Sequence, residues 1–148
     1  MPTDTHQAIL KDLFLALHAF VQPRGGIVHF APLRMQIRPD AFREPDLLLL
    51  RDAGDPRRQD RYWLGADLVL EVVSPDKPER DLVDKRFDYA EAGVPEYWIV
   101  NPLNQTITVL TLQGDAYVEH GVFTRGALAT SALLSGFTVD VSAAFDAD

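Results

Sequence analysis

The chain contains the stretch Glu44-Pro45-Asp46-Leu47-Leu48-Leu49-Leu50, in which four leucines follow a proline and an aspartate. A continuous apolar run of about four to eight residues between chain breakers is typical of a central strand that is covered on both faces. A second stretch of this kind, Leu68-Val69-Leu70-Glu71-Val72-Val73-Ser74-Pro75, carries Glu71 in its interior. A buried ionised carboxylate costs free energy unless it is paired or binds a metal. The two stretches predict a buried sheet in which Asp46 and Glu71 need a partner of opposite charge.

Periodic patterns on either side of these stretches predict the remaining elements. Apolar residues recur at helical spacing between residues 9 and 21, after a capping sequence that begins at Asp4, and the pattern ends before Pro23. Residues 33–37 alternate between apolar and polar types, which indicates a strand with one solvated face. A second helix is expected over residues 80–92, with Gly93 as its stop. Further strands are expected at residues 27–30, 96–100, 106–112 and 117–118, near residue 123 and at 137–141, with a loop at 51–61.

The order of these elements predicts an α/β fold with one mixed β-sheet flanked by helices and a β-rich C-terminal part. The crossover helix at 80–92 would place the strand at 96–100 parallel to the strand that contains Glu71. A length of 148 residues is typical of one domain, so we expect a single domain over residues 1–148.

Composition excludes several classes of protein and site. The chain has no cysteine, so disulfides and thiolate metal sites are excluded, and any metal must have oxygen or nitrogen ligands. It has neither an apolar run of membrane-spanning length nor a basic segment at its N-terminus, so we expect a cytoplasmic protein with no membrane partner. It also lacks a glycine-rich phosphate-binding motif, which leaves a nucleotide cofactor without support.

The distribution of charge bears on nucleic-acid binding. The net charge of −8 argues against indiscriminate binding to nucleic acid. The basic residues are nevertheless concentrated, because residues 34–86 contain 11 of the 14 lysines and arginines with 12 of the 22 acids, a net charge of about −1. A bound divalent cation would make this region positive. The alternative interpretation is a solvated surface of mixed charge.

Three residues could together form a metal-dependent catalytic site. Asp46 and Glu71 lie 25 positions apart, on strands that could be neighbours. Their carboxylates could share Mg²⁺ with water, with a substrate phosphate and with a backbone carbonyl near Val72. Such an ion polarises a phosphodiester and generates a hydroxide-like nucleophile. Lys85 on the second predicted helix could orient the attacking water or offset charge on the phosphate, and His6 at the start of the first helix could reach the same site.

Each candidate also has a purely structural interpretation. Asp46 follows a proline and could be only a turn residue where the strand begins. Glu71 could form a buried ion pair with Lys85 or Arg86. Lys85 could be a solvated helix residue, and His6 could be structural or lie on the surface. Core positions are expected for Tyr89, Tyr97 and Trp98.

Several of these motifs together resemble one protein family. They are Pro45-Asp46, the segment Glu71-Val72-Val73-Ser74-Pro75, Asp81 with Lys85 and Tyr89, and the segment Ala92-Gly93-Val94-Pro95-Glu96-Tyr97-Trp98-Ile99-Val100. The most specific part is Gly-Val-Pro-Glu-Tyr-Trp in the last segment. On these grounds, the chain resembles the Uma2 family of restriction endonucleases. This family belongs to the PD-(D/E)XK nuclease superfamily. The similarity extends from the helix that contains His6-Gln7 to the tail around Gly136-Phe137.

The resemblance implies a restriction-endonuclease-like core and cleavage of DNA phosphodiesters that depends on Mg²⁺ or Mn²⁺. By position, Asp46 and Glu71 match the metal-binding acids of the family, and Lys85 matches a lysine displaced from the strand onto the helix. The usual lysine position of the superfamily is occupied by Val73. Family members typically carry an extra N-terminal segment with strands. Without such a segment one sheet edge would be open, and we expect a homodimer.

These observations lead to three hypotheses. The first is a metal-dependent DNA endonuclease in which Asp46 and Glu71 bind the metal, Lys85 is catalytic and His6 is accessory. The second is a catalytically silent module on the same fold that binds nucleic acid or a partner protein, which the acidic net charge favours. The third is a metal-dependent hydrolase of a smaller phosphate ester. Preference for a long duplex over small esters would distinguish the first from the third.

Overall fold

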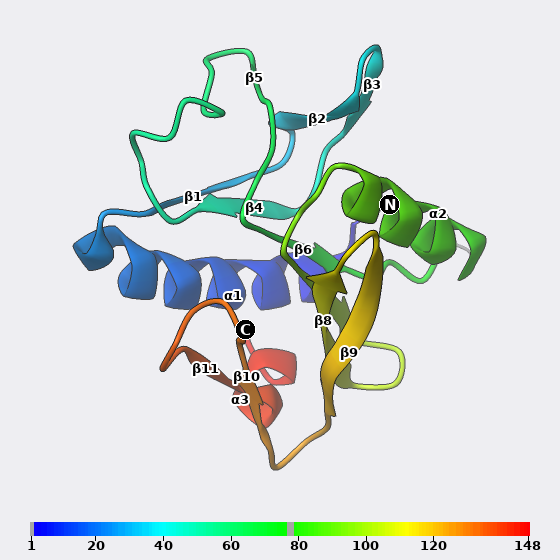
Figure 1. The fold of residues 1–148 in the computed structure, drawn as a ribbon. Coiled ribbons are helices and arrows are strands. Elements are labelled where there is room, and N and C mark those ends of the chain that lie inside the picture. The colour runs from blue at the N-terminus through cyan, green and yellow to red at the C-terminus, as the bar shows by residue number, and fades with distance from the viewer. Residues whose placement is uncertain (1, 77–78) are drawn as a thin grey trace.

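A six-stranded sheet forms the centre of the computed structural model, which describes residues 2–76 and 79–148 (Figure 1). Its strands, in spatial order, are β1 (Ile27–Phe30), β4 (Leu47–Leu50), β6 (Leu68–Val72), β7 (Glu96–Asn101), β8 (Thr106–Gln113) and β9 (Ala116–Phe123). β6 and β7 run parallel, and every other neighbouring pair is antiparallel. The predicted α/β fold with a mixed sheet is confirmed, including the parallel pairing of the strands on either side of the second helix.

β4 is buried on both faces, as its uninterrupted apolar sequence predicts. All four of its leucines are fully buried. Leu47 and Leu49 pack into the core that α1 (Asp4–Val21) covers, and Leu48 and Leu50 pack into a second core that includes Tyr89 of α2 (Glu79–Glu91). Because successive side chains of a strand point to opposite faces, one short strand supplies both cores.

α1 presents one apolar face to the sheet. The most deeply buried residues of that face are Ile9, Leu13, Leu17 and Val21. The N-cap is Thr3, whose hydroxyl accepts a hydrogen bond from the amide of His6 at 3.1 Å. The prediction of Asp4 as the cap is wrong by one position, because the backbone is extended at Thr3 and already helical at Asp4. No helix among the described residues is both long and apolar enough to cross a membrane.

α2 connects β6 to β7 and lies against the face of the sheet opposite α1 (Figure 1). Its predicted stop is confirmed. Gly93 follows the helix with a φ of +74°, and the amide of Val94 donates to the carbonyl of Tyr89 at 3.1 Å. Glycine adopts this left-handed conformation without the clash that a Cβ atom would cause.

Two smaller sheets accompany the central one, which corrects the expectation of a single sheet. A three-stranded sheet contains β2 (Arg34–Arg38), β3 (Ala41–Arg43) and β5 (Tyr62–Trp63). A two-stranded sheet contains β10 (Leu128–Thr130) and β11 (Thr138–Asp140), and the other described elements are the 3-10 turn η1 (Gln22–Arg24) and α3 (Val141–Phe145). β2 has the predicted solvated face, since Met35 and Ile37 are buried while Arg34 and Arg38 are exposed.

The C-terminal part is attached to the central sheet through the buried carboxylate of Glu96, at the start of β7. Its Oε1 accepts hydrogen bonds from the amides of Ala132 and Leu133 at 2.9 and 3.0 Å. Its Oε2 accepts hydrogen bonds from Trp98 Nε1 at 2.8 Å and from Ser131 Oγ at 2.5 Å. Four donors therefore compensate the loss of water around this carboxylate.

Candidate active site

Asp46 and Glu71 lie at the same end of two paired strands. β4 and β6 are antiparallel with Leu47 opposite Leu70, so the next position of the same pairing places Asp46 opposite Glu71. Asp46 Oδ2 accepts a hydrogen bond from the amide of Val72 at 2.7 Å, which holds the carboxylate against the end of β6. The expectation that these strands are neighbours is confirmed.

Glu71 is 4% exposed, and its side chain contacts α2. The hydroxyl of Tyr89 donates a hydrogen bond to Glu71 Oε2 at 2.6 Å, and Lys85 Nζ lies 3.3 Å from the same oxygen. Burial raises the pKa of Glu71, and Lys85 and Tyr89 counteract this rise only in part. Both partners belong to α2, whereas the charge of Asp46, before β4, raises the pKa of Glu71 further.

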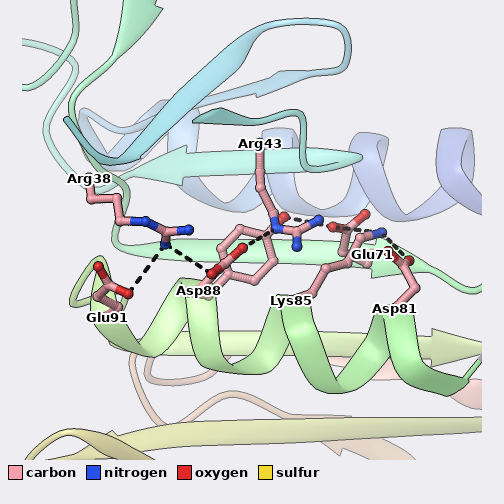
Figure 2. Close-up of polar contacts among 8 residues, drawn as sticks. Arg38, Arg43, Glu71, Asp81, Lys85, Asp88 and Glu91 are labelled. Carbon is pink, nitrogen blue, oxygen red and sulfur yellow. Dashed lines mark hydrogen bonds and ion pairs between the residues drawn. The ribbon is translucent and has the colours of Figure 1, made fainter. Parts of the chain in front are cut away.

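Lys85 lies between two carboxylates (Figure 2). Its Nζ is 3.2 Å from Asp81 Oδ2, one helical turn earlier, and 3.3 Å from Glu71 Oε2. Burial lowers the pKa of the Lys85 ammonium, but the two carboxylates outweigh burial, so the pKa is raised. Lys85 is therefore held in its charged form.

His6 reaches the same place from the first turn of α1. Its Nε2 donates to the carbonyl of Val72 at 3.1 Å and lies 3.6 Å from Asp46 Oδ2. The interaction with Asp46 raises the pKa of His6 and outweighs the opposing effect of burial. The other ring nitrogen, Nδ1, is buried and has no hydrogen-bond partner among the described residues.

These side chains surround one cavity of about 150 Å³. Its lining includes His6, Asp46, Glu71 and Lys85, the four residues that the sequence singles out. They come from α1, from the segment before β4, from β6 and from α2, so only the folded chain brings them together. Two carboxylates, an ammonium group and an imidazole around one cavity can bind a phosphate ester and orient a water molecule.

Comparison with known proteins shows the family of the chain. The model of the Uma2 family, described as "Putative restriction endonuclease", matches residues 1–142 of the 148. The chain belongs to the Uma2 family. A search of curated proteins found no match to it.

The fold of this Uma2 chain also occurs in a crystal structure of a protein from Anabaena variabilis, described as "a putative nuclease belonging to DUF820". The two proteins share 21% sequence identity and superpose with a TM-score of 0.80, over 99% of this chain and 83% of the other. At this level of identity the similarity shows the fold alone.

The oxygen atoms of the Uma2 site fit a hard cation. Asp46 Oδ1 and Glu71 Oε1 accept no hydrogen bond from any described residue, so each carboxylate keeps one oxygen for a ligand. Residues 2–76 and 79–148 contain no group of three or more His, Asp or Glu side chains arranged to hold a metal. Mg²⁺ does not require such a group, because it usually binds one or two carboxylates and keeps several waters. The Val72 carbonyl, considered as a further ligand, accepts the His6 hydrogen bond.

Two contacts of the Uma2 site are absent from the sequence-based prediction. Tyr89 is in the core as predicted, but its hydroxyl bonds Glu71, and Asp81 pairs with Lys85. The signal that could have identified both is their spacing, because residues 81, 85 and 89 follow one face of a helix. The ion pair of Glu71 with Lys85, the structural alternative, is present, whereas Arg86 donates to a backbone carbonyl of β9.

Asp88 attaches α2 to the three-stranded sheet (Figure 2). Arg43 Nε of β3 donates to Asp88 Oδ2 at 2.7 Å. Arg38 Nη1 of β2 donates to Asp88 Oδ1 at 3.1 Å and to Glu91 Oε1 at 3.3 Å. Burial opposes ionisation of Asp88, but the two arginines outweigh it and lower the pKa of Asp88. The helix that carries Lys85 is thus fastened to a neighbouring sheet by a second set of ion pairs.

Proposed function

We propose that this Uma2 chain is a metal-dependent DNA endonuclease that hydrolyses phosphodiester bonds. The observation that carries the proposal is the convergence of Asp46, Glu71 and Lys85 on one cavity. Carboxylates and an ammonium group together can bind a divalent cation and a phosphate at the same place. The description of the family as a restriction endonuclease supports the same activity.

In this proposal Asp46 and Glu71 bind Mg²⁺ or Mn²⁺. A bound ion of this kind supplies Lewis-acid polarisation of the phosphodiester and a water molecule with a lowered pKa. The amide of Val72 orients Asp46, and the hydroxyl of Tyr89 orients Glu71. Both carboxylates therefore have a fixed orientation before substrate binds, which is the arrangement that efficient catalysis requires.

Lys85 is the proposed cationic catalytic group. Asp81 stays beside its ammonium when Glu71 binds metal, so Lys85 keeps an anionic partner and its charge. The remaining N–H groups can donate to a phosphate oxygen or to the attacking water. His6 is the proposed accessory residue, because its imidazole adjoins Asp46 and can carry a proton at the margin of the site.

Cationic side chains beside the site suit the backbone of DNA. An adjoining cavity of about 340 Å³ shares Glu71 and Lys85 with the catalytic cavity, and Arg34 and Arg43 also line it. The guanidinium of Arg34 lies 4.7 Å from the centre of the Phe42 ring. Glu44 and Asp81 line the same cavity, and Arg43 is paired with Asp88, so Arg34 is the cation here that can contact a backbone phosphate.

Cleavage of supercoiled plasmid tests the proposal. We expect the wild type to nick plasmid with Mg²⁺ or Mn²⁺ and not with EDTA. Glu71→Ala and Lys85→Ala should each lower the rate by roughly a hundredfold or more, because each removes a group that stabilises the transition state. Asp84→Asn changes an exposed acid of the same helix and should nick as fast as the wild type. Equal nicking by all four proteins would contradict the proposal and indicate a contaminating nuclease.

The same preparation distinguishes the alternatives. Absence of cleavage of both plasmid and single-stranded DNA by pure wild-type protein with either metal would favour a catalytically silent nucleic-acid- or protein-binding module, an alternative that the net charge of −8 supports. Faster hydrolysis of a small diester, such as bis(p-nitrophenyl) phosphate, than of DNA would favour a hydrolase of smaller phosphate esters.

A further inference from the structure

A cavity of about 480 Å³, the second cavity, adjoins the catalytic cavity of about 150 Å³. It differs from the cavity of about 340 Å³ that Arg34 and Arg43 line. Residues of the first half of α1 and of the end of β1 line the second cavity, and His6 and Asp46 line both the second and the catalytic cavity. A ligand with a phosphate at Asp46 and Glu71 would therefore place a neighbouring group at this second cavity. The catalytic cavity is rich in charged groups, whereas the second cavity is mostly apolar.

Two phenylalanine rings contribute most of the aromatic surface of the second cavity. Phe14 of α1 and Phe30 of β1 contact each other edge to face, with ring centres 5.1 Å apart. Phe30 is 54% exposed, although a ring of this size contributes most to stability when it is buried. Leu10 and Leu47 extend the apolar lining. An aromatic wall open to solvent beside a charged site suits a flat apolar group that is covalently joined to a charged one.

Two polar side chains of α1 stand beside this wall. Gln7 and Lys11 are one helical turn apart and exposed, and both line the cavity. A carboxamide can both donate to and accept from the edge of a nucleobase, and an ammonium group can contact a backbone phosphate. Lys11 Nζ donates to a backbone oxygen of Asp148 at 3.3 Å, an exposed contact that a phosphate can replace.

We propose that this second cavity binds one unstacked nucleobase of the substrate, next to the phosphate that is cleaved. The inference rests on the proposed nuclease function, because that function places the phosphate at Asp46 and Glu71. A base within a duplex is stacked and paired, so it must be extruded before it can enter a cavity of the protein. The substrate is therefore a single strand, or a duplex with an unpaired nucleotide at the cleavage position. An aromatic ring can stack on any of the bases, so the second cavity should select DNA by its strand structure and not by its sequence.

Fluorescence of 2-aminopurine tests this inference, because neighbouring bases quench it and it rises when the base leaves the stack of its own strand. The probes are a single-stranded oligonucleotide with one 2-aminopurine and the same strand in a fully paired duplex, with Ca²⁺ in place of Mg²⁺ to prevent turnover. We expect the wild type to raise the fluorescence of the single strand and to bind this strand more tightly than the duplex. Phe30→Ala should weaken binding of the single strand by roughly tenfold, and Phe30→Trp should restore it. Phe87→Ala removes another exposed phenylalanine, outside this cavity, and should bind like the wild type.

Cleavage of the same oligonucleotides with Mg²⁺ separates this inference from the proposed function. A wild type that cleaves nothing, but whose effect on 2-aminopurine fluorescence depends on Phe30, would overturn the nuclease proposal and support a base site. A wild type that cleaves duplex and single strand equally, with no effect of Phe30→Ala, would overturn the base site and keep the nuclease. A dimer that Phe30→Ala dissociates, without any effect on the 2-aminopurine fluorescence, would overturn the base site in favour of a second copy of the chain as the occupant.

Discussion

Glu71 uses its two carboxylate oxygens differently. Oε2 contacts Tyr89 and Lys85, whereas Oε1 accepts no hydrogen bond from any described residue. The contacts to Oε2 compensate part of the cost of burial and fix the side chain. Glu71 also lines the cavity of about 150 Å³, and a carboxylate oxygen without a hydrogen-bond donor is what its proposed role as a metal ligand requires.

Tyr89→Phe should change the titration of Glu71 without changing the shape of the site. The hydrogen bond from Tyr89 lowers the pKa of Glu71, so its removal should raise that pKa further. Because the proposed metal site needs the ionised carboxylate, the acidic limb of the pH–rate profile for nicking should move to higher pH. Urea denaturation at neutral pH should show a loss of about 1–2 kcal/mol in the free energy of unfolding.

Tyr117→Phe is the matched control for this prediction. Its buried hydroxyl donates to the carbonyl of Val94 at 2.7 Å, away from the four candidate catalytic residues. Its loss should lower stability by about 1 kcal/mol and leave the pH–rate profile unchanged. A shift of the acidic limb in Tyr117→Phe as large as in Tyr89→Phe would contradict a specific action of Tyr89 on Glu71.

Sequence reasoning identifies the residues of the site when their chemistry conflicts with their surroundings. Glu71 was found because it interrupts an apolar run, and Asp46 because it precedes one. Asp81 and Tyr89 carry no such conflict, since an acid is ordinary near the start of a helix and a tyrosine is ordinary in a core. Their contacts depend on how α2 is rotated about its axis, which only the packed structure specifies.

At the scale of elements, α2 is the helix whose position matters most, because it carries Lys85 and Tyr89 and lies against two sheets. Asp88→Asn should weaken the attachment of α2 to the three-stranded sheet. The pKa of Asp88 in the folded protein is below its usual value of 3.8. The stabilisation by Arg43 and Arg38 is therefore present above pH 3.8 and is lost as the pH falls through the folded pKa.

Urea denaturation of Asp88→Asn and of the wild type at two pH values measures this effect. At pH 7 the variant should be less stable by about 1 kcal/mol, and at pH 3 the difference should be smaller. Asp84→Asn, on the same helix but exposed, should match the wild type at both pH values. A difference for Asp88→Asn that is independent of pH would contradict an electrostatic origin.

Long or uniformly apolar elements were predictable, and so were the short strands β1 and β11, but β3, β5 and β10 were not. α1, β4, β6 and β7 have patterns that set them apart from their flanks, and their boundaries agree with prediction to within two residues. β3, β5 and β10 have two or three residues each, too few to show a period. Their pairing depends on partners elsewhere in the chain, such as β5 with β2, so the second and third sheets could not be inferred from local sequence.

At the scale of the whole molecule, a metal that binds only the folded state should raise the thermal midpoint. A ligand at about 100 times its Kd adds about 2.7 kcal/mol to the free energy of unfolding. For a chain of this length that corresponds to a rise in Tm of about 5–10 °C. Differential scanning calorimetry with Mg²⁺ or Mn²⁺ should show the rise in the wild type and in Asp88→Asn. In Glu71→Gln it should be absent, and a rise of equal size there would exclude Glu71 as a metal ligand.

The edges of the central sheet bear on assembly. β1 and β9 each have one neighbour in that sheet, so each has backbone groups on its outer side that a second chain could pair with. The homodimer expected from the sequence stays a prediction, and sedimentation velocity would measure it.

The three cavities around the site are lined only by residues between Pro2 and Tyr89 among those that the structure describes. The strands from β7 onward contribute no lining residue, yet β7 is the partner that keeps β6 in place. The chain thus divides into a part that holds the candidate catalytic residues and a later part that supports them. A substitution in the first part can alter the chemistry directly. A substitution in the second acts through residues that support the site, such as Tyr97, whose ring packs against Tyr89, so the later half should have more freedom to diverge.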